Sequence, residues 1–309
     1  GSATCQICAA GKYVSTKGSK DCFDCPQGWK RAELDTPTSC KQCDMGEKAS
    51  YNGSTTCQIC AAGKFVSTKG SHICFDCPQG WKRAEQDNST TCKQCDMGEK
   101  ASSAGSVTCQ ICAAGKYVST KGSNVCFECP QGWKRAELDP SISCKQCDMG
   151  EKASSEGSAL CQICAAGKYV STKGSKDCFE CPQGWKRAEL DPPTSCKQCD
   201  MGEKASSEGT VLCQICAAGK FVSTKGSSSC FECPQGWKRA ELDSPTSCKQ
   251  CEMGEKASFN GTAVCQICAA GKFVSTKGSS SCSVCPQGWK RAELDSPTSC
   301  KQCDMGEKA

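Results

Sequence analysis

The cysteines are the residues of this chain whose type and spacing can do chemistry. The 309-residue sequence contains 36 of them, on a strict 52-residue period that opens at Cys5, Cys57, Cys109, Cys161, Cys213 and Cys265. Paired cysteines can form disulfides, coordinate zinc or carry out thiol redox chemistry. One of these three chemistries must therefore account for the fold.

Each repeat contains three copies of the pattern C-x2-C-x2-G, which begin at Cys5, Cys22 and Cys40 in the first repeat. The steps from Cys5 to Cys22, to Cys40 and on to Cys57 are 17, 18 and 17 residues. Two successive pairs also match a four-cysteine zinc site, but zinc modules usually alternate a ligand span with a linker of different length. A catalytic CxxC needs a βαβ context, which is absent. We predict disulfides, with zinc as the alternative.

The rest of the composition explains why cross-links are needed. With 30 glycines and only 6% aromatic residues, the chain cannot build a sizeable apolar core. A disulfide that closes a loop of about 15 residues contributes roughly 3 kcal/mol in the chain-entropy treatment. The sequence therefore predicts a small disulfide-rich repeat array, an elongated rod or solenoid of short β-hairpin loops with little regular secondary structure.

Short extended segments are expected after the glycines, at 11–16, 29–33 and 48–50 in the first repeat, and no stretch between cysteines is long enough for an amphipathic helix. We divide the chain into six repeats of three CxxC units each, at 1–52, 53–104, 105–156, 157–208, 209–260 and 261–309. No atypical capping repeat is seen, and we therefore expect either that the sequence is part of a longer array or that its ends are completed by neighbouring copies.

The loop C-A-A-G-K-Y that closes on Cys22 resembles the first small loop of a tumour necrosis factor receptor cysteine-rich domain, and resembles the ephrin-receptor-like modules even more. The match is strongest in the first two units and weakens in the third, where Lys48 replaces the aromatic residue. The resemblance implies that the second cysteine of one CxxC pairs with the first of the next. Six cysteines allow fifteen pairings, and the spacing favours this ladder without selecting it alone. The implied pairs, repeated along the array, are Cys8–Cys22, Cys25–Cys40, Cys43–Cys57, Cys60–Cys74, Cys77–Cys92 and Cys95–Cys109, with Cys5 and Cys303 left to pair with neighbouring segments.

Disulfides imply an oxidising compartment. Three Asn-x-Ser/Thr sequons, at Asn52, Asn88 and Asn260, lie in polar stretches and are candidate N-glycosylation sites. The sequence contains no long apolar run that could insert into a membrane. We therefore expect a secreted, extracellular glycoprotein.

Nothing in the sequence points to an enzyme, a cofactor or nucleic acid. The single histidine, His72, occupies a position filled by Lys20 or Ser228 in other repeats, which indicates a surface residue. The net charge of +5 is spread over six repeats with acidic and basic residues interleaved, whereas a nucleic-acid binder concentrates its positive charge. Lys30 and Arg31 are accordingly expected on a solvated, salt-bridged face.

Two aromatic positions recur in every repeat, one of them always tryptophan. The rings can pack over a disulfide and its glycine, or they can form a stripe, flanked by Lys-Arg, that docks on another molecule. The candidate assembly contacts are Trp29, Trp81, Trp133, Trp185, Trp237 and Trp289.

The near-identity of the repeats suits a periodic partner, most simply copies of the chain itself. We expect a structural extracellular protein that forms a self-associating filament, appendage or wall. The alternative is the stalk or ectodomain of a cell-surface adhesion or receptor protein.

Overall fold

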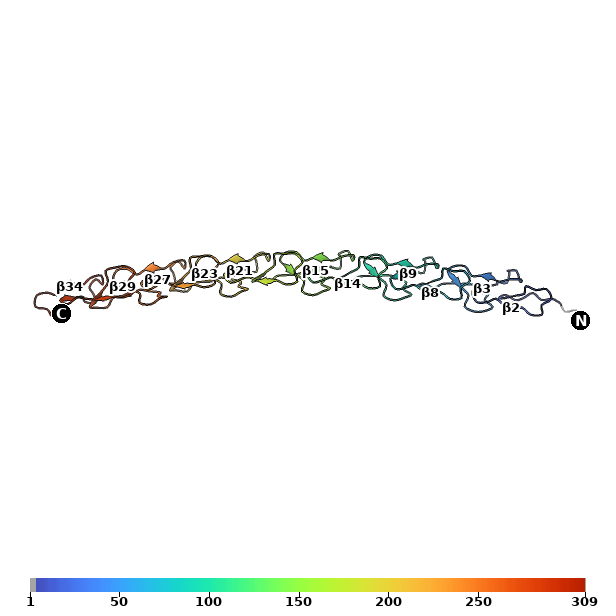
Figure 1. Cartoon of the computed structure of the whole chain (residues 1–309), viewed down its shortest axis with the longest axis horizontal. Coiled ribbons are helices and arrows are strands. Elements are labelled where there is room, and N and C mark those ends of the chain that lie inside the picture. The colour runs from blue at the N-terminus through green and yellow to red at the C-terminus, as the bar shows by residue number, and fades with distance from the viewer. Residues whose placement is uncertain (1–3, 309) are drawn as a thin grey trace. The chain divides into compact units, whose positions relative to one another are not determined.

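The computed structural model describes residues 4–308 and contains no helix within that range, hence none that could cross a membrane. Its secondary structure consists of two-residue strands that pair as two-stranded antiparallel hairpins, as Figure 1 shows. Every hairpin joins a strand that follows a unit glycine to the two residues between the cysteines of the next CxxC. The fold is a disulfide-rich repeat array with little regular secondary structure.

Three types of hairpin alternate along the chain. The first type pairs β1 (Lys12–Tyr13) with β2 (Phe23–Asp24), β7 (Lys64–Phe65) with β8 (Phe75–Asp76), β13 (Lys116–Tyr117) with β14 (Phe127–Glu128), β19 (Lys168–Tyr169) with β20 (Phe179–Glu180), β25 (Lys220–Phe221) with β26 (Phe231–Glu232), and β31 (Lys272–Phe273) with β32 (Ser283–Val284). The second pairs β3 (Trp29–Lys30) with β4 (Lys41–Gln42), β9 (Trp81–Lys82) with β10 (Lys93–Gln94), β15 (Trp133–Lys134) with β16 (Lys145–Gln146), β21 (Trp185–Lys186) with β22 (Lys197–Gln198), β27 (Trp237–Lys238) with β28 (Lys249–Gln250), and β33 (Trp289–Lys290) with β34 (Lys301–Gln302). The third pairs β5 (Glu47–Lys48) with β6 (Gln58–Ile59), β11 (Glu99–Lys100) with β12 (Gln110–Ile111), β17 (Glu151–Lys152) with β18 (Gln162–Ile163), β23 (Glu203–Lys204) with β24 (Gln214–Ile215), and β29 (Glu255–Lys256) with β30 (Gln266–Ile267).

The glycine of each C-x2-C-x2-G pattern sets the turn that starts a hairpin. Gly11 has φ +80°, a conformation that costs glycine little, and the Lys12 N–H donates to the Ala9 carbonyl across the turn. The site is also crowded, because a Cβ added at Gly11 would lie 2.1 Å from the Gly53 carbonyl oxygen of the unit after next. Both the backbone angle and the close approach therefore require glycine here.

Disulfides close every hairpin loop. All cysteines from Cys8 to Cys300 are disulfide-bonded, and the assigned pairs span 14 or 15 residues with Cα–Cα distances of 5.7 to 5.9 Å. The pairs are those of the ladder that the resemblance implies, from Cys8–Cys22, Cys25–Cys40 and Cys43–Cys57 through Cys60–Cys74, Cys77–Cys92 and Cys95–Cys109. Sulfurs bound in this way are not available as the thiolate ligands that the zinc alternative requires.

A narrow interior runs through the loops and holds one side chain per unit besides the cystine. From Cys8 to Cys268 the second cysteine of each CxxC is buried, and from Arg31 to Arg291 so is the residue three places after the unit glycine. That inward position cycles through valine, arginine and alanine, as in Val66, Arg83 and Ala101. The cystines thus provide most of the apolar interior.

Backbone hydrogen bonds join each unit to the following ones. The Gly28 N–H donates 2.9 Å to the Ala49 carbonyl, and the Ala49 N–H donates 3.2 Å to the Ser71 carbonyl. The Gly53 N–H, in turn, donates 2.7 Å back to the Cys25 carbonyl. Each loop is thus held by its neighbours along the chain, as in other repeat architectures.

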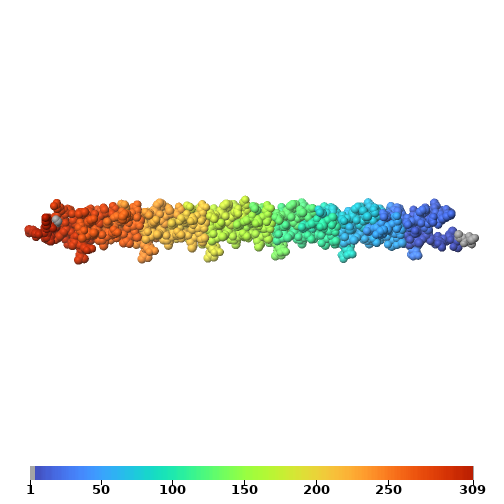
Figure 2. Space-filling view, turned by 90° about the horizontal axis from the view of Figure 1, so that it is seen from below, coloured from blue at the N-terminus to red at the C-terminus, as the bar shows by residue number. Residues whose placement is uncertain are grey.

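The chain divides into two compact parts, the first formed by Gly1–Gln146 and Ala153–Cys161 and the second by Cys147–Lys152 and Gln162–Ala309. Each part contains all three types of hairpin and the same inward cycle of valine, arginine and alanine. Within each part, Figure 2 shows a small projection once per repeat.

Candidate assembly surface

The loop between Cys25 and Cys40 is built around a buried charged residue, Arg31, which is only 1% exposed. Its guanidinium donates to four backbone carbonyls, those of Cys8, Ala9, Lys12 and Asp35. The same arrangement recurs at Arg83, Arg135, Arg187, Arg239 and Arg291. Hydrogen bonds to a charged group are stronger than those between neutral groups, and these satisfy carbonyls of the preceding loop.

The expectation that Arg31 lies on a solvated, salt-bridged face is therefore wrong. Its guanidinium forms no ion pair with a carboxylate within residues 4–308, and backbone oxygens take that place. The missed signal lies in the internal comparison of the units, since arginine stands where the other two units have valine and alanine. A position that is apolar in two units out of three points inward in all three.

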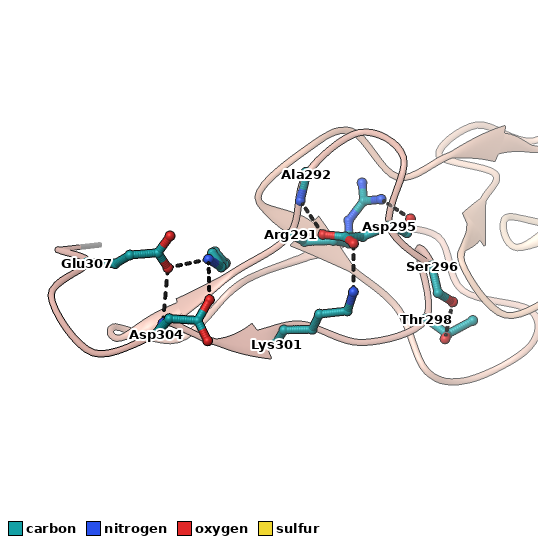
Figure 3. Close-up of polar contacts among 9 residues, drawn as sticks. Arg291, Ala292, Asp295, Ser296, Thr298, Lys301, Asp304 and Glu307 are labelled. Atoms are coloured by element: carbon teal, nitrogen blue, oxygen red, sulfur yellow. Dashed lines mark hydrogen bonds and ion pairs between the residues drawn. The ribbon is translucent and has the colours of Figure 1, made fainter.

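An acidic residue four places later organises the turn beyond each arginine. The Asp35 carboxylate accepts 2.8 Å from the Ala32 N–H and 2.5 Å from the Lys41 ammonium. The hydrogen bond from Lys41, followed by that from Ala32, holds the pKa of Asp35 below its usual range. Figure 3 shows the same turn in the last repeat, where Ala292 and Lys301 both donate to Asp295.

The tryptophans form a shallow aromatic shelf on the surface. In the first repeat the shelf consists of Tyr13, Pro26, Trp29, Ser39 and Cys40 and borders a hollow of about 310 Å³. The fourth repeat has the equivalent shelf, with a hollow of about 230 Å³ lined by Tyr169, Pro182, Trp185, Ser195 and Cys196. No charged side chain lines either hollow.

The shelf combines the two roles considered for the tryptophans. Trp29 is half-buried beside Pro26 and the Cys25–Cys40 disulfide, so part of the ring stabilises its own loop. The remaining face borders the hollow. Trp81, Trp133, Trp185 and Trp237 are half-buried like Trp29. An open aromatic face without charges suits an apolar group.

Other apolar side chains are exposed that sequence reasoning missed. Leu34 is fully exposed, and so are the equivalent residues Leu138, Leu190, Leu242 and Leu294. Ile59, at a different position, is 70% exposed and also recurs in each repeat. The recurrence of leucine in five of the six repeats and of isoleucine in all six was the available signal that these positions are used, but it did not show that they are exposed.

The three sequons lie on the surface. Asn52, Asn88 and Asn260 are exposed. The side-chain oxygen of Asn52 accepts 3.0 Å from the Gln27 N–H, and that of Asn260 accepts 3.1 Å from the equivalent Gln235 N–H. These contacts use the oxygen, while the nitrogen that would carry a sugar makes no hydrogen bond within residues 4–308.

The other singled-out residues also lie at the surface or near it. His72 is exposed, Cys5 is an exposed free thiol and Cys303 is a half-buried free thiol. Lysines and carboxylates form scattered surface ion pairs, such as Lys12 with Asp24 and Lys69 with Asp44. Exposed pairs of this kind contribute little to stability.

No protein-family model matches the chain, and no curated protein matches it. The resemblance to ephrin-receptor-like modules therefore rests on the cysteine motifs and the disulfide ladder. The assembly surface has to be interpreted from its own geometry.

Proposed function

We propose that the chain is a structural extracellular protein whose repeats associate with copies of themselves into a filament, appendage or wall. The observation that supports this best is the recurrence, every 52 residues, of the residues that form the aromatic shelf and of an exposed isoleucine, with an exposed leucine in five of the six repeats. A receptor for a single ligand needs a local, differentiated surface. A surface that repeats itself along the sequence suits a partner with the same repeat.

The disulfides support a location outside the cell. A chain with a disulfide in every loop requires an oxidising compartment, which for most proteins means secretion. The exposed sequons support N-glycosylation of at least one of Asn52, Asn88 and Asn260. Mass spectrometry before and after enzymatic deglycosylation of the native protein tests this, and unmodified masses at all three sites would contradict it.

The experiment that tests self-association is electron microscopy of the native material combined with sedimentation of the purified full chain. Concentration-dependent growth into extended assemblies is expected. A chain that stays monomeric at all concentrations would overturn the proposal.

The resemblance to ephrin-receptor-like and tumour necrosis factor receptor-like modules favours a second candidate, the stalk or ectodomain of a cell-surface protein. In that case the repeats would only hold a separate binding head away from a membrane. The sedimentation experiment separates the two, since a stalk stays dispersed.

A further inference from the structure

In five of the six repeats a leucine stands at the apex of a tight turn and is fully exposed, without a partner among residues 4–308. These leucines, which we call the knobs, are Leu34, Leu138, Leu190, Leu242 and Leu294. Within each of the two compact parts, Figure 2 shows one projection per repeat, in the colours of the segments that carry this turn. A fully exposed leucine at five of six equivalent positions is apolar surface that the fold itself does not use.

We propose that each knob inserts into the aromatic shelf of a second copy of the chain. This inference rests on the proposed self-association and specifies the contact that would produce it. The knob lies in the loop between Cys25 and Cys40, and the shelf is formed by that loop together with Tyr13 of the preceding loop, so each copy offers both halves of the contact.

The turn presents the leucine rigidly. Around Leu34, the Asp35 N–H donates 3.1 Å to the Ala32 carbonyl, and the Ala32 N–H donates 2.8 Å to the Asp35 carboxylate. The buried Arg31 also donates 3.2 Å to the Asp35 carbonyl. A side chain held on such a turn loses little backbone freedom on binding, which favours association.

The leucine is not needed for the turn itself. In the second repeat Gln86 takes its place, and the turn keeps its hydrogen bonds, from Asp87 to Ala84 at 3.1 Å and from Ala84 to Asp87 at 2.9 Å. Arg83 likewise still donates 3.0 Å to the Asp87 carbonyl. The chain thus contains its own evidence that leucine at this position serves something other than folding.

The shelf suits an aliphatic occupant. Its hollow in the first repeat is lined by the Trp29 and Tyr13 rings, Pro26 and Cys40, and its polar lining consists of three hydroxyl side chains without charge, those of Ser15, Thr38 and Ser39. A glycan from a neighbouring copy would be another partner for aromatic rings. Sequons occur only at Asn52, Asn88 and Asn260, at irregular intervals, so glycans cannot fill a shelf in every repeat.

Charge also favours a second copy as the partner. Glu33, next to the knob, is exposed and forms no ion pair within residues 4–308. On the hairpin that carries the shelf, Lys30 lies directly opposite Lys41, and Asp35 forms an ion pair with Lys41 alone. A knob therefore brings a carboxylate to a hairpin on which two lysines lie opposite each other.

Several such contacts are needed for a stable complex. A specific interface buries about 800 Å² on each partner, while a single aromatic side chain offers roughly 150–250 Å² in all. One half-buried tryptophan with one leucine is too small alone. Repeated contacts between the same two chains add their free energies, because the second and later contacts form within one complex.

The test uses three variants of the full chain. The knob variant carries Leu34→Gln, Leu138→Gln, Leu190→Gln, Leu242→Gln and Leu294→Gln, the residue that the second repeat already has. The shelf variant carries arginine at the exposed rim position, as Ser39→Arg, Thr91→Arg, Ser143→Arg, Ser195→Arg, Ser247→Arg and Ser299→Arg. The control variant removes as many exposed apolar residues elsewhere, as Ile59→Gln, Ile111→Gln, Ile163→Gln, Ile215→Gln and Ile267→Gln.

Sedimentation should show that the knob variant and the shelf variant each associate at least about a hundredfold more weakly than the wild type, while the control variant is unchanged. A mixture of the knob and shelf variants should form complexes again, since one supplies shelves and the other knobs. Three outcomes would overturn this contact but not the proposed self-association. These are normal association of the knob variant, equal weakening of association in the control variant, and a mixture of the knob and shelf variants that stays dispersed. A wild-type chain that stays monomeric would overturn both.

Discussion

At the scale of single residues, the buried arginine is a group that is costly to replace. Desolvating a guanidinium is unfavourable unless its donors are satisfied, and here four carbonyls accept from it. The arginine also joins two loops, because Cys8, Ala9 and Lys12 belong to the loop before its own. It therefore acts as a polar cross-link beside the covalent ones.

Replacing Arg83 by methionine should destabilise its two loops by about 2–4 kcal/mol, since the carbonyls of Cys60, Ala61 and Lys64 would lose their donors. Hydrogen exchange measured by mass spectrometry should show faster exchange confined to residues 60–87 and their direct neighbours. The control is Lys82→Met, at the half-exposed neighbouring position, which should change exchange little. Equal effects of the two substitutions would contradict the role assigned to the arginine.

The turn aspartate should make this loop sensitive to acid. Hydrogen bonds from Lys93 and from the Ala84 N–H lower the pKa of Asp87 in the folded chain. Because the folded pKa lies below the unfolded value of about 3.9, the stability that this carboxylate contributes is present above that pH. It is lost as the pH falls through the lowered folded pKa.

An NMR titration of the carboxyl carbons should give Asp87 a midpoint below that of a peptide aspartate. Lys93→Met should move the midpoint back up, because it removes the main cause of the shift. A wild-type midpoint at or above the peptide value would be incompatible with this account.

The cysteine and glycine roles were predictable from spacing, because cross-links and positive-φ turns leave a strict pattern in the sequence. The role of Arg31 was not, since a charged residue next to Lys30 looks solvated unless the units are compared position by position. The exposure of Leu34 was equally hidden. Burial depends on which side of a turn a residue occupies, and a two-residue strand has no period long enough to show that.

At the scale of the hairpin, the predicted extended segments after each glycine are only partly formed. The segment expected at 29–33 contributes just β3, Trp29–Lys30, because the Arg31 side chain turns inward and the turn to Asp35 begins directly after it. The partner strand, β4, lies inside the next CxxC, between Cys40 and Cys43. Sequence alone did not identify this partner, because two residues are too few for an alternating pattern.

Gly11 and Gly18 provide a matched test of the crowding between hairpins, since both have φ +80°. Alanine at either position carries the same left-handed strain of about 1–2 kcal/mol. At Gly18 the new Cβ meets nothing within 4 Å, whereas at Gly11 it meets the Gly53 carbonyl oxygen at 2.1 Å. Gly11→Ala should therefore be clearly the more damaging.

Hydrogen exchange at the Gly53 and Cys25 amides, on the two sides of this contact, should rise more in Gly11→Ala than in Gly18→Ala. Similar exchange in both variants would mean that the backbone angle alone, and not the approach of the two units, requires glycine at Gly11.

At the scale of the whole chain, stability should be local and additive. Each assigned disulfide closes its own loop of 14 or 15 residues, and no assigned disulfide joins distant repeats. Removing Cys112–Cys126 through Cys112→Ser and Cys126→Ser should cost roughly 3 kcal/mol and should affect mainly the opened loop and its neighbours.

Limited proteolysis should then cut the double variant near residues 112–126 and leave the other loops resistant. Full reduction should abolish resistance throughout the chain, while a metal chelator should have no effect. Unfolding of the entire chain by the single opened loop would contradict a stability built from neighbouring units.

The repeat array was predictable because the cysteines recur in the sequence every 52 residues. Six near-identical repeats of three loops follow from counting, and the ladder of pairs follows from the resemblance. The way the repeats are used depends on the aromatic shelf and the leucine turn, which are geometric features that only the folded loops create.

The disulfide ladder also determines how the protein responds to pulling force. A covalent path crosses each loop through its cystine, so the 13 or 14 residues between the two cysteines cannot be drawn out while the bond is intact. Only the short links between the two cysteines of each CxxC, such as Cys22 to Cys25, lie on the load-bearing path. From backbone reach, a repeat can lengthen to about 50 Å when oxidised, against about 180 Å when reduced. The oxidised chain should therefore extend little under force, and a reducing agent should make it far more extensible.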